Sequence, residues 1–164
     1  MITRLTFILI STLIISYELK AQFTSVTELT PLEAREFATR EKHQAKVFTL
    51  NGKHWAILAN SSGTHLWRLQ GSTWIHELNL VSRNSRADYV ISGNVVHILL
   101  FSGKSSQFIS VEYDKNEGIF KHWKGAKQAT EIMLEDGVQI ASVELDKTGR
   151  MWIASNGLSG SIHM

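Results

Sequence analysis

Cysteine is missing from this 164-residue sequence, proline occurs once, and the longest apolar run is short. Without cysteine the chain forms no disulfide and is not a lipoprotein, so its fold must rest on a core and on hydrogen-bond ladders. Common catalytic signatures are missing too. The sequence contains no G-x-S-x-G, no H-E-x-x-H, no phosphate-binding loop and no dinucleotide fingerprint.

The N-terminal segment has the layout of a secretory signal. Arg4 precedes the apolar run LTFILISTLII at 5–15, and a small residue, Ala21, ends the segment. The run is shorter than the roughly 20 residues of a transmembrane helix, although an uncleaved anchor is the alternative. We therefore predict a signal peptide at 1–21, cleavage after Ala21, a secreted or periplasmic location and no membrane span in the mature chain.

Positive and negative charges nearly balance. The chain has 17 Lys and Arg against 15 Asp and Glu, and loss of residues 1–21 would remove two basic residues and one acidic residue. The remaining net charge of +1 gives no electrostatic argument for nucleic acid or an anionic membrane as a partner. The remaining 143 residues are enough for one ordinary domain.

One short helix is predicted within the N-terminal segment 22–44. In TPLEAREFATREKHQ, Thr30 to Gln44, the first threonine is a suitable N-cap, Pro31 occupies the first helical position and Glu33 completes a capping box. Its apolar stripe is weak, so a packing or capping role is expected.

From residue 45 onward, short apolar runs alternate with turn residues, which is typical of an all-β domain. We predict strands at Lys46–Leu50, His54–Ala59, Thr64–Leu69, Thr73–Leu80, Asp88–Ile91, Val95–Phe101, Gln107–Tyr113, Ile119–Trp123, Ile140–Leu145, Met151–Ser155 and Ser161–His163.

An internal repeat groups these strands. Gly52 is followed by Trp55 and Gly149 by Trp152 at the same spacing, and a weaker copy without tryptophan begins near Gly93. The intervals from Gly52 to Gly93 and from Gly93 to Gly149 are of the size that indicates four-stranded units such as propeller blades. The pattern predicts an incomplete propeller-like array of about two and a half four-stranded blades over 45–164, with units near 45–82, 87–124 and 139–164.

DKTGRMWIASNGL at 146–158 resembles the repeat of the two-component regulator propeller family. The matching positions are Asp146, Gly149, Trp152, Ile153, Gly157 and Leu158. The resemblance implies an extracytoplasmic β-propeller that acts as a sensor or binding platform. The residues also suit a structural role, because the aspartate can cap its turn, the glycine can adopt positive φ and the tryptophan can fill the space between sheets.

Four aromatic and histidine side chains form the candidate ligand patch. A two-residue turn at Gln70-Gly71 would pair Trp67 with Trp74 and His65 with His76, which puts all four on one face. That face is either a carbohydrate-stacking or metal-binding patch, or a packing face between blades. Two histidines make a poor zinc site, so no metal or cofactor is expected. GSTW at 71–74 also resembles half of a sialidase Asp-box.

No catalytic constellation is visible, because the carboxylates fall mostly in turns or on exposed strand positions. The favoured hypothesis is an exported, non-enzymatic binding or interaction module whose ligand is a glycan or a protein. Two and a half blades cannot close a propeller, so we expect either further blades or self-association. The alternatives are a fragment of a propeller-fold glycosidase or polysaccharide lyase, and a sensory fragment.

Overall fold

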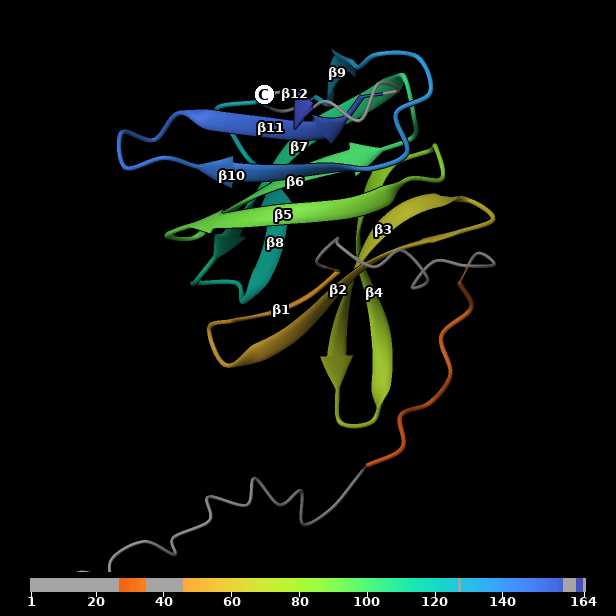
Figure 1. Ribbon diagram of the computed structural model, residues 1–164. Coiled ribbons are helices and arrows are strands. Elements are labelled where there is room, and N and C mark those ends of the chain that lie inside the picture. The colour runs from red at the N-terminus through yellow and green to blue at the C-terminus, as the bar shows by residue number, and fades with distance from the viewer. Residues whose placement is uncertain (1–26, 35–45, 127, 158–161, 164) are drawn as a thin grey trace, which may run out of the picture.

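The predicted all-β class is confirmed: all the regular structure in the described part of the chain is β-strand. The computed structural model describes residues 27–34, 46–126, 128–157 and 162–163. The strands form three antiparallel sheets (Figure 1). Sheet A contains β1 (Val47–Leu50), β2 (Lys53–Asn60), β3 (Gly63–Gln70) and β4 (Thr73–Val81). Sheet B contains β5 (Arg86–Ser92), β6 (Val95–Phe101), β7 (Ser105–Asp114), β8 (Ile119–His122) and β9 (Thr130–Met133), and sheet C contains β10 (Ala141–Leu145), β11 (Met151–Asn156) and β12 (Ile162–His163).

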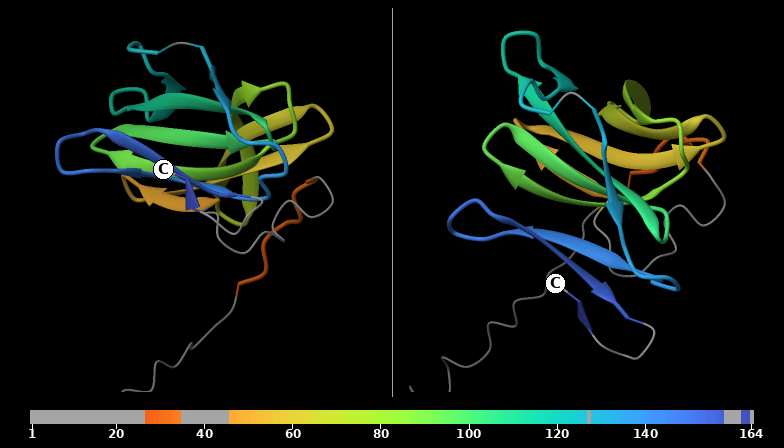
Figure 2. Two further views of the ribbon diagram at one scale, coloured as in Figure 1. Left: turned by 45° about the horizontal axis from the view of Figure 1, so that its top comes forward. Right: turned by 90° about the horizontal axis from the view of Figure 1, so that it is seen from above.

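The three sheets stack face to face with sheet B in the middle (Figure 2). The core between sheets A and B is rich in aromatic rings. Trp55 is 0% exposed, and its ring centroid lies 4.7 Å from that of Phe120 and 5.8 Å from that of Tyr113, both in sheet B. Phe48 packs edge-on against Phe120 at 6.1 Å. These offset and edge-on contacts are the geometries that aromatic pairs prefer.

A second, smaller core joins sheets B and C. Leu99 and Phe101 of β6 pack there against Ala141 and Val143 of β10. The residues of β6 therefore alternate between the two cores: Val96, Ile98 and Leu100 face sheet A, whereas Leu99 and Phe101 face sheet C. This arrangement explains why VVHILLF is apolar on nearly every position: both faces of the strand are covered.

The first strands of the three sheets lie in the order β1, β5, β10 (Figure 1). The Tyr89 hydroxyl of β5 donates to the Val47 carbonyl of β1 at 3.0 Å. On the other side, the amide of Val143 in β10 donates to a carboxylate oxygen of Asp88 in β5, also at 3.0 Å. Each neighbouring pair of sheets is thus linked by a side chain of β5 as well as by its core.

Equivalent positions in the three sheets point the same way along the stack. Trp55 and His97 each lie in the third backbone pair from the turn that joins the first two strands of their sheet. Trp152 is also third when the hydrogen-bonded Asp146 and Arg150 are counted as the first pair. Trp55 faces sheet B, and His97 stacks on Phe108, which packs against the core shared with sheet C. In sheet C the adjacent Ile153 faces that core, so Trp152 points away from sheet B.

The repeat glycines lie in these same turns. Gly52, Gly93 and Gly149 have φ values of 71°, 61° and 80° in sheets A, B and C. Glycine adopts this left-handed conformation without the Cβ clash that other residues meet. The fourth repeat glycine, Gly157, is buried just after β11.

The predicted helix is not formed in the residues that can be described. Residues 27–34 contain no helix, and 35–44 lie outside the described residues. The amide of Thr30 donates to the carbonyl of Ser72 at 2.7 Å, and its hydroxyl lies 3.4 Å from that of Thr73. Thr30 therefore contacts the β3–β4 turn instead of capping a helix. The predicted signal peptide at 1–21 also lies outside the described residues, and no described helix is long and apolar enough to cross a membrane.

Two predictions about strands are wrong. The β3–β4 turn lies at Gly71-Ser72, not Gln70-Gly71, because Gln70 pairs with Thr73. Gly71 has a φ of 60°, which favours it as the first turn residue. β9 is not among the predicted strands. It pairs antiparallel with the start of β7, where polar residues leave little apolar periodicity to read.

Replacement of Trp55 by alanine should lower the free energy of unfolding by about 3–5 kcal/mol, because it opens a cavity in the A–B core. Urea denaturation followed by circular dichroism measures this change. Met133 is 62% exposed, so Met133→Ala serves as the control, with an expected change within about 0.5 kcal/mol. Equal effects of the two substitutions would contradict the buried position of Trp55.

Candidate functional site

The predicted ligand patch lies on the outer face of sheet A, the face turned away from sheet B. His65, Trp67 and His76 form a cluster there, with ring centroids 5.8 Å (His65–Trp67), 5.3 Å (His65–His76) and 5.4 Å (Trp67–His76) apart. Trp74 pairs with Leu69, nearer the turn, on the same face. Three of the four predicted side chains therefore touch, and the fourth lies beside them.

The expected pairing within this patch is wrong. Trp67 pairs with His76 because the turn lies one residue later than predicted. The register then shifts twice farther from the turn, and the first of these shifts makes His65 pair with Asn79. One shift lies between Leu66 and Trp67, where β4 contains an additional residue. Such β-bulges cannot be read from alternation of side chains alone, since they insert a residue into one strand.

His65 is buried and tied to its neighbours by both ring nitrogens. Its Nδ1 lies 2.7 Å from Oδ1 of Asn79, and its Nε2 lies 2.9 Å from Oδ1 of Asn60 and 3.0 Å from the Ser62 hydroxyl. Nε2 of the exposed His76 lies 2.9 Å from the same Asn79 oxygen. These nitrogens are occupied by protein groups, so the cluster is built to hold its shape.

The cluster does not have the composition of a metal centre. Within the described ranges, no three His, Cys, Asp or Glu side chains come together in a way that would hold a metal ion. The Trp67 indole donates to the Leu58 carbonyl at 3.4 Å, and two histidine rings meet the indole edge-on. This geometry favours the packing-face interpretation of the patch over a metal-binding one.

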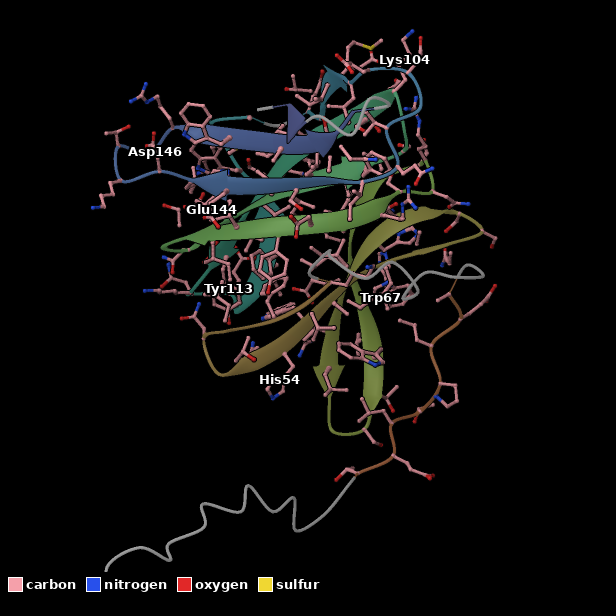
Figure 3. The ribbon with its side chains drawn as sticks, viewed as in Figure 1. His54, Trp67, Lys104, Tyr113, Glu144 and Asp146 are labelled. Atoms are coloured by element: carbon pink, nitrogen blue, oxygen red, sulfur yellow. The ribbon has the colours of Figure 1, made fainter. Side chains whose placement is uncertain are left out.

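A hollow of about 420 Å³ lies where sheets B and C meet, beside the outer face of sheet C. The outer face of sheet C is the face that points away from sheet B, and it carries Ser142, Glu144, Trp152 and Ala154. Trp152 is 45% exposed. Figure 3 shows Glu144 on β10, at the opposite end of the stack from His54 and Trp67 of sheet A. The hollow thus combines an exposed indole with carboxylate and hydroxyl oxygens.

Two further groups line this hollow from β5. The Asp88 carboxylate is buried and accepts the Val143 amide, and the Tyr89 hydroxyl donates to a carbonyl of β1. Burial, and secondly the negative charge of Asp88, raise the pKa of Tyr89. Asp88 and Tyr89 therefore hold the sheets together, whereas Glu144 and Trp152 are the groups turned outward.

The orientation of Trp152 is set by the turn before it. Oδ2 of Asp146 accepts the Trp152 indole N–H at 3.0 Å, while Oδ1 accepts the Thr148 hydroxyl at 2.6 Å and the Arg150 amide at 3.0 Å. The side-chain hydrogen bond from Thr148, followed by that from Trp152, holds the pKa of Asp146 far below its usual range. The ring is therefore held in one orientation although it is exposed.

A second hollow of about 470 Å³ lies at the β7–β8 end of sheet B. Lys121 lines it, and its ammonium bonds to Glu117 at 2.5 Å and to Asp114 at 3.0 Å. These two bonds raise the pKa of Lys121, and the bond from Lys121 lowers that of Asp114. Since this cation is already paired with two carboxylates, the second hollow is the weaker candidate.

Sequence reasoning did not find either hollow. The first is lined by residues from strands far apart in the chain, such as Tyr89 and Glu144, whereas the second is lined mainly by the β7–β8 hairpin. The only signal for the first one was the repeat tryptophan Trp152, whose position in the motif predicts packing and not exposure. Which repeat tryptophan is covered depends on how many sheets stack, and local sequence does not encode that number.

Substitution of Thr148 by valine should raise the pKa of Asp146 more than Trp152→Phe does, because the Thr148 hydroxyl is the stronger of the two side-chain donors. Carbon-13 NMR of the carboxyl group during a pH titration measures both shifts. The folded pKa is depressed, so the turn is stabilised above the pKa of an unfolded aspartate, about 3.9, and loses that stabilisation as pH falls through the folded value. Thr130→Val, on β9, is the control, and a larger shift in Trp152→Phe would refute the assignment.

No protein-family model matches the sequence, and the searches of curated proteins and of solved structures give no match either.

Proposed function

We propose that this chain is an exported, non-enzymatic binding or interaction module built of propeller-type repeats. The observation that supports it is the common orientation of the three sheets. Trp55, His97 and Trp152 point the same way along the stack, and the first strands follow one another in chain order. Successive antiparallel sheets with this regular relation are the building plan of propeller blades.

The outer faces at the two ends of the stack are the contact surfaces of such a module. Sheet B has both faces covered, whereas no other described sheet covers the outer face of A or C. The contrast is clearest at the repeat tryptophans: Trp55 is 0% exposed and Trp152 is 45% exposed. An exposed aromatic side chain held in one orientation is a favourable contact group, because binding costs little further conformational entropy.

The hollow beside the outer face of sheet C has the chemistry of a carbohydrate platform. The Trp152 ring offers an apolar surface for stacking, and Glu144 and Ser142 supply oxygen atoms that accept hydrogen bonds from hydroxyl groups. A glycan is therefore the first ligand to test, and a protein partner is the second. Secretion or a periplasmic location, which the signal-like segment before Ala21 predicts, would expose the module to both.

One observation favours the enzymatic alternative of a glycosidase. Asp88 and Glu144 line the same hollow, and glycosidases use a pair of carboxyl groups. Asp88, however, already accepts the Val143 amide and is buried, so its carboxylate has a structural role at the B–C junction. The non-enzymatic module is the stronger proposal.

Titration with neutral and acidic oligosaccharides, followed by tryptophan emission, tests the proposal, with release of sugar products measured in parallel. We expect saturable binding without turnover. Trp152→Ala should weaken binding about tenfold, the loss typical of one well-placed aromatic contact, and Met133→Ala should leave it unchanged. Sugar release that Glu144→Gln abolishes would establish the enzymatic alternative. Binding that is insensitive to Trp152→Ala would remove the outer face of sheet C as the contact surface.

A further inference from the structure

The stack has a direction, and its two ends differ. Each sheet turns its repeat position toward the next sheet in the chain: Trp55 toward sheet B and His97 toward sheet C. The opposite face receives the preceding sheet, as Ile98 does in sheet B and Ile153 does in sheet C. The outer face of sheet C therefore carries the repeat position, and we call it the donating face. The outer face of sheet A is the face that would pack against a preceding sheet, and we call it the receiving face.

The contacts of Trp55 show what a repeat tryptophan packs against. Its ring meets Tyr113 on the third strand of sheet B and Phe120 on the fourth strand. On the receiving face of sheet A, the third and fourth strands carry Trp67 and Trp74. The outer face of sheet A thus offers aromatic side chains on the same strands that receive Trp55 within the stack.

The polar groups on the two end faces are complementary as well. Glu144 pairs with Trp152 across β10 and β11 on the donating face. The receiving face carries His54 and His76, both exposed, and it has an exposed apolar residue at Val47, which is 58% exposed. A carboxylate can accept a hydrogen bond from an imidazole N–H, which adds attraction to the apolar contact.

We infer that the partner of these faces is a second copy of this chain, bound head to tail. The outer face of sheet C in one copy packs on the outer face of sheet A in the other, with Trp152 against Trp67 and Trp74. This contact continues the relation that already joins sheet A to B and B to C, and so it rests on the propeller-type order proposed above. Two copies of the three described sheets make six, which lies within the four to eight blades of closed propellers. The same contact then occurs twice around a two-fold axis, so the ring closes.

Light scattering coupled to size-exclusion chromatography of the full chain tests this inference. We expect twice the mass of one chain, as measured by mass spectrometry of the same sample. Trp152→Glu and Val47→Glu alter opposite ends of the stack, and each should raise the dissociation constant about 30-fold, as loss of an interface hot spot does. Met133→Glu places the same charge at another exposed apolar residue, on β9, and should leave the dimer intact. Circular dichroism establishes that each variant is folded.

Mixing the two charged variants distinguishes head-to-tail contact from symmetric contact. In a head-to-tail dimer, Trp152→Glu retains a native receiving face and Val47→Glu retains a native donating face, so the mixture recovers one native interface and associates more tightly than either variant alone. If sheet C paired with sheet C, Val47→Glu would have no effect and mixing would restore nothing. A monomeric wild-type chain would overturn the inference. Because the second copy covers Trp152 in both contacts, a glycan on that face competes with the dimer. Oligosaccharide binding to a monomeric chain would leave the proposed function standing, because that experiment reads ligand binding and not mass.

Discussion

The middle sheet can exist only if both of its faces are covered, and the rest of the structure follows from that constraint. Val96, Ile98, Leu99 and Leu100 of β6 are all 0% exposed, although they point to opposite sides. A strand with apolar residues on both faces would expose half of them to water unless a sheet lay on each side. Sheets A and C supply that cover (Figure 2), and no other described sheet lies on the outer face of either.

Carboxylates at the sheet junctions add direction to this apolar packing. Glu77 of β4 accepts the Phe120 amide of sheet B at 3.0 Å and also binds Arg68 at 3.2 Å. Asp88 of β5 likewise accepts a hydrogen bond from the amide of Val143 in sheet C. Apolar contact alone does not fix the register between two sheets. A carboxylate that accepts a hydrogen bond from one particular amide does fix it. These groups therefore determine how neighbouring sheets are placed, and they are not free for chemistry.

The candidate site was partly predictable, for a physical reason. Trp67, His65 and His76 could be placed on one face because alternation in a hairpin brings such residues together. Their contacts could not be predicted, because the turn lies one residue later than predicted and a register shift between Leu66 and Trp67 brings Asn79 next to His65. The hollow at sheet C was beyond local patterns altogether, since it joins β5 to β10 across about fifty residues of chain. The exposure of Trp152 likewise follows from its position in the last described sheet.

The sequence by itself determined the class, most of the strands and their turns. Apolar runs, turn glycines and the spacing from Gly52 to Trp55 and from Gly149 to Trp152 are local, and local propensity is sufficient for them. Tertiary structure decided the rest. It decided that Thr30 contacts a β-turn where its sequence favours a helix, that β9 joins sheet B, and that of two equivalent tryptophans one is buried and the other faces solvent. These outcomes depend on which surfaces meet, and burial against a distant segment outweighs a local preference of a few tenths of a kcal/mol per residue.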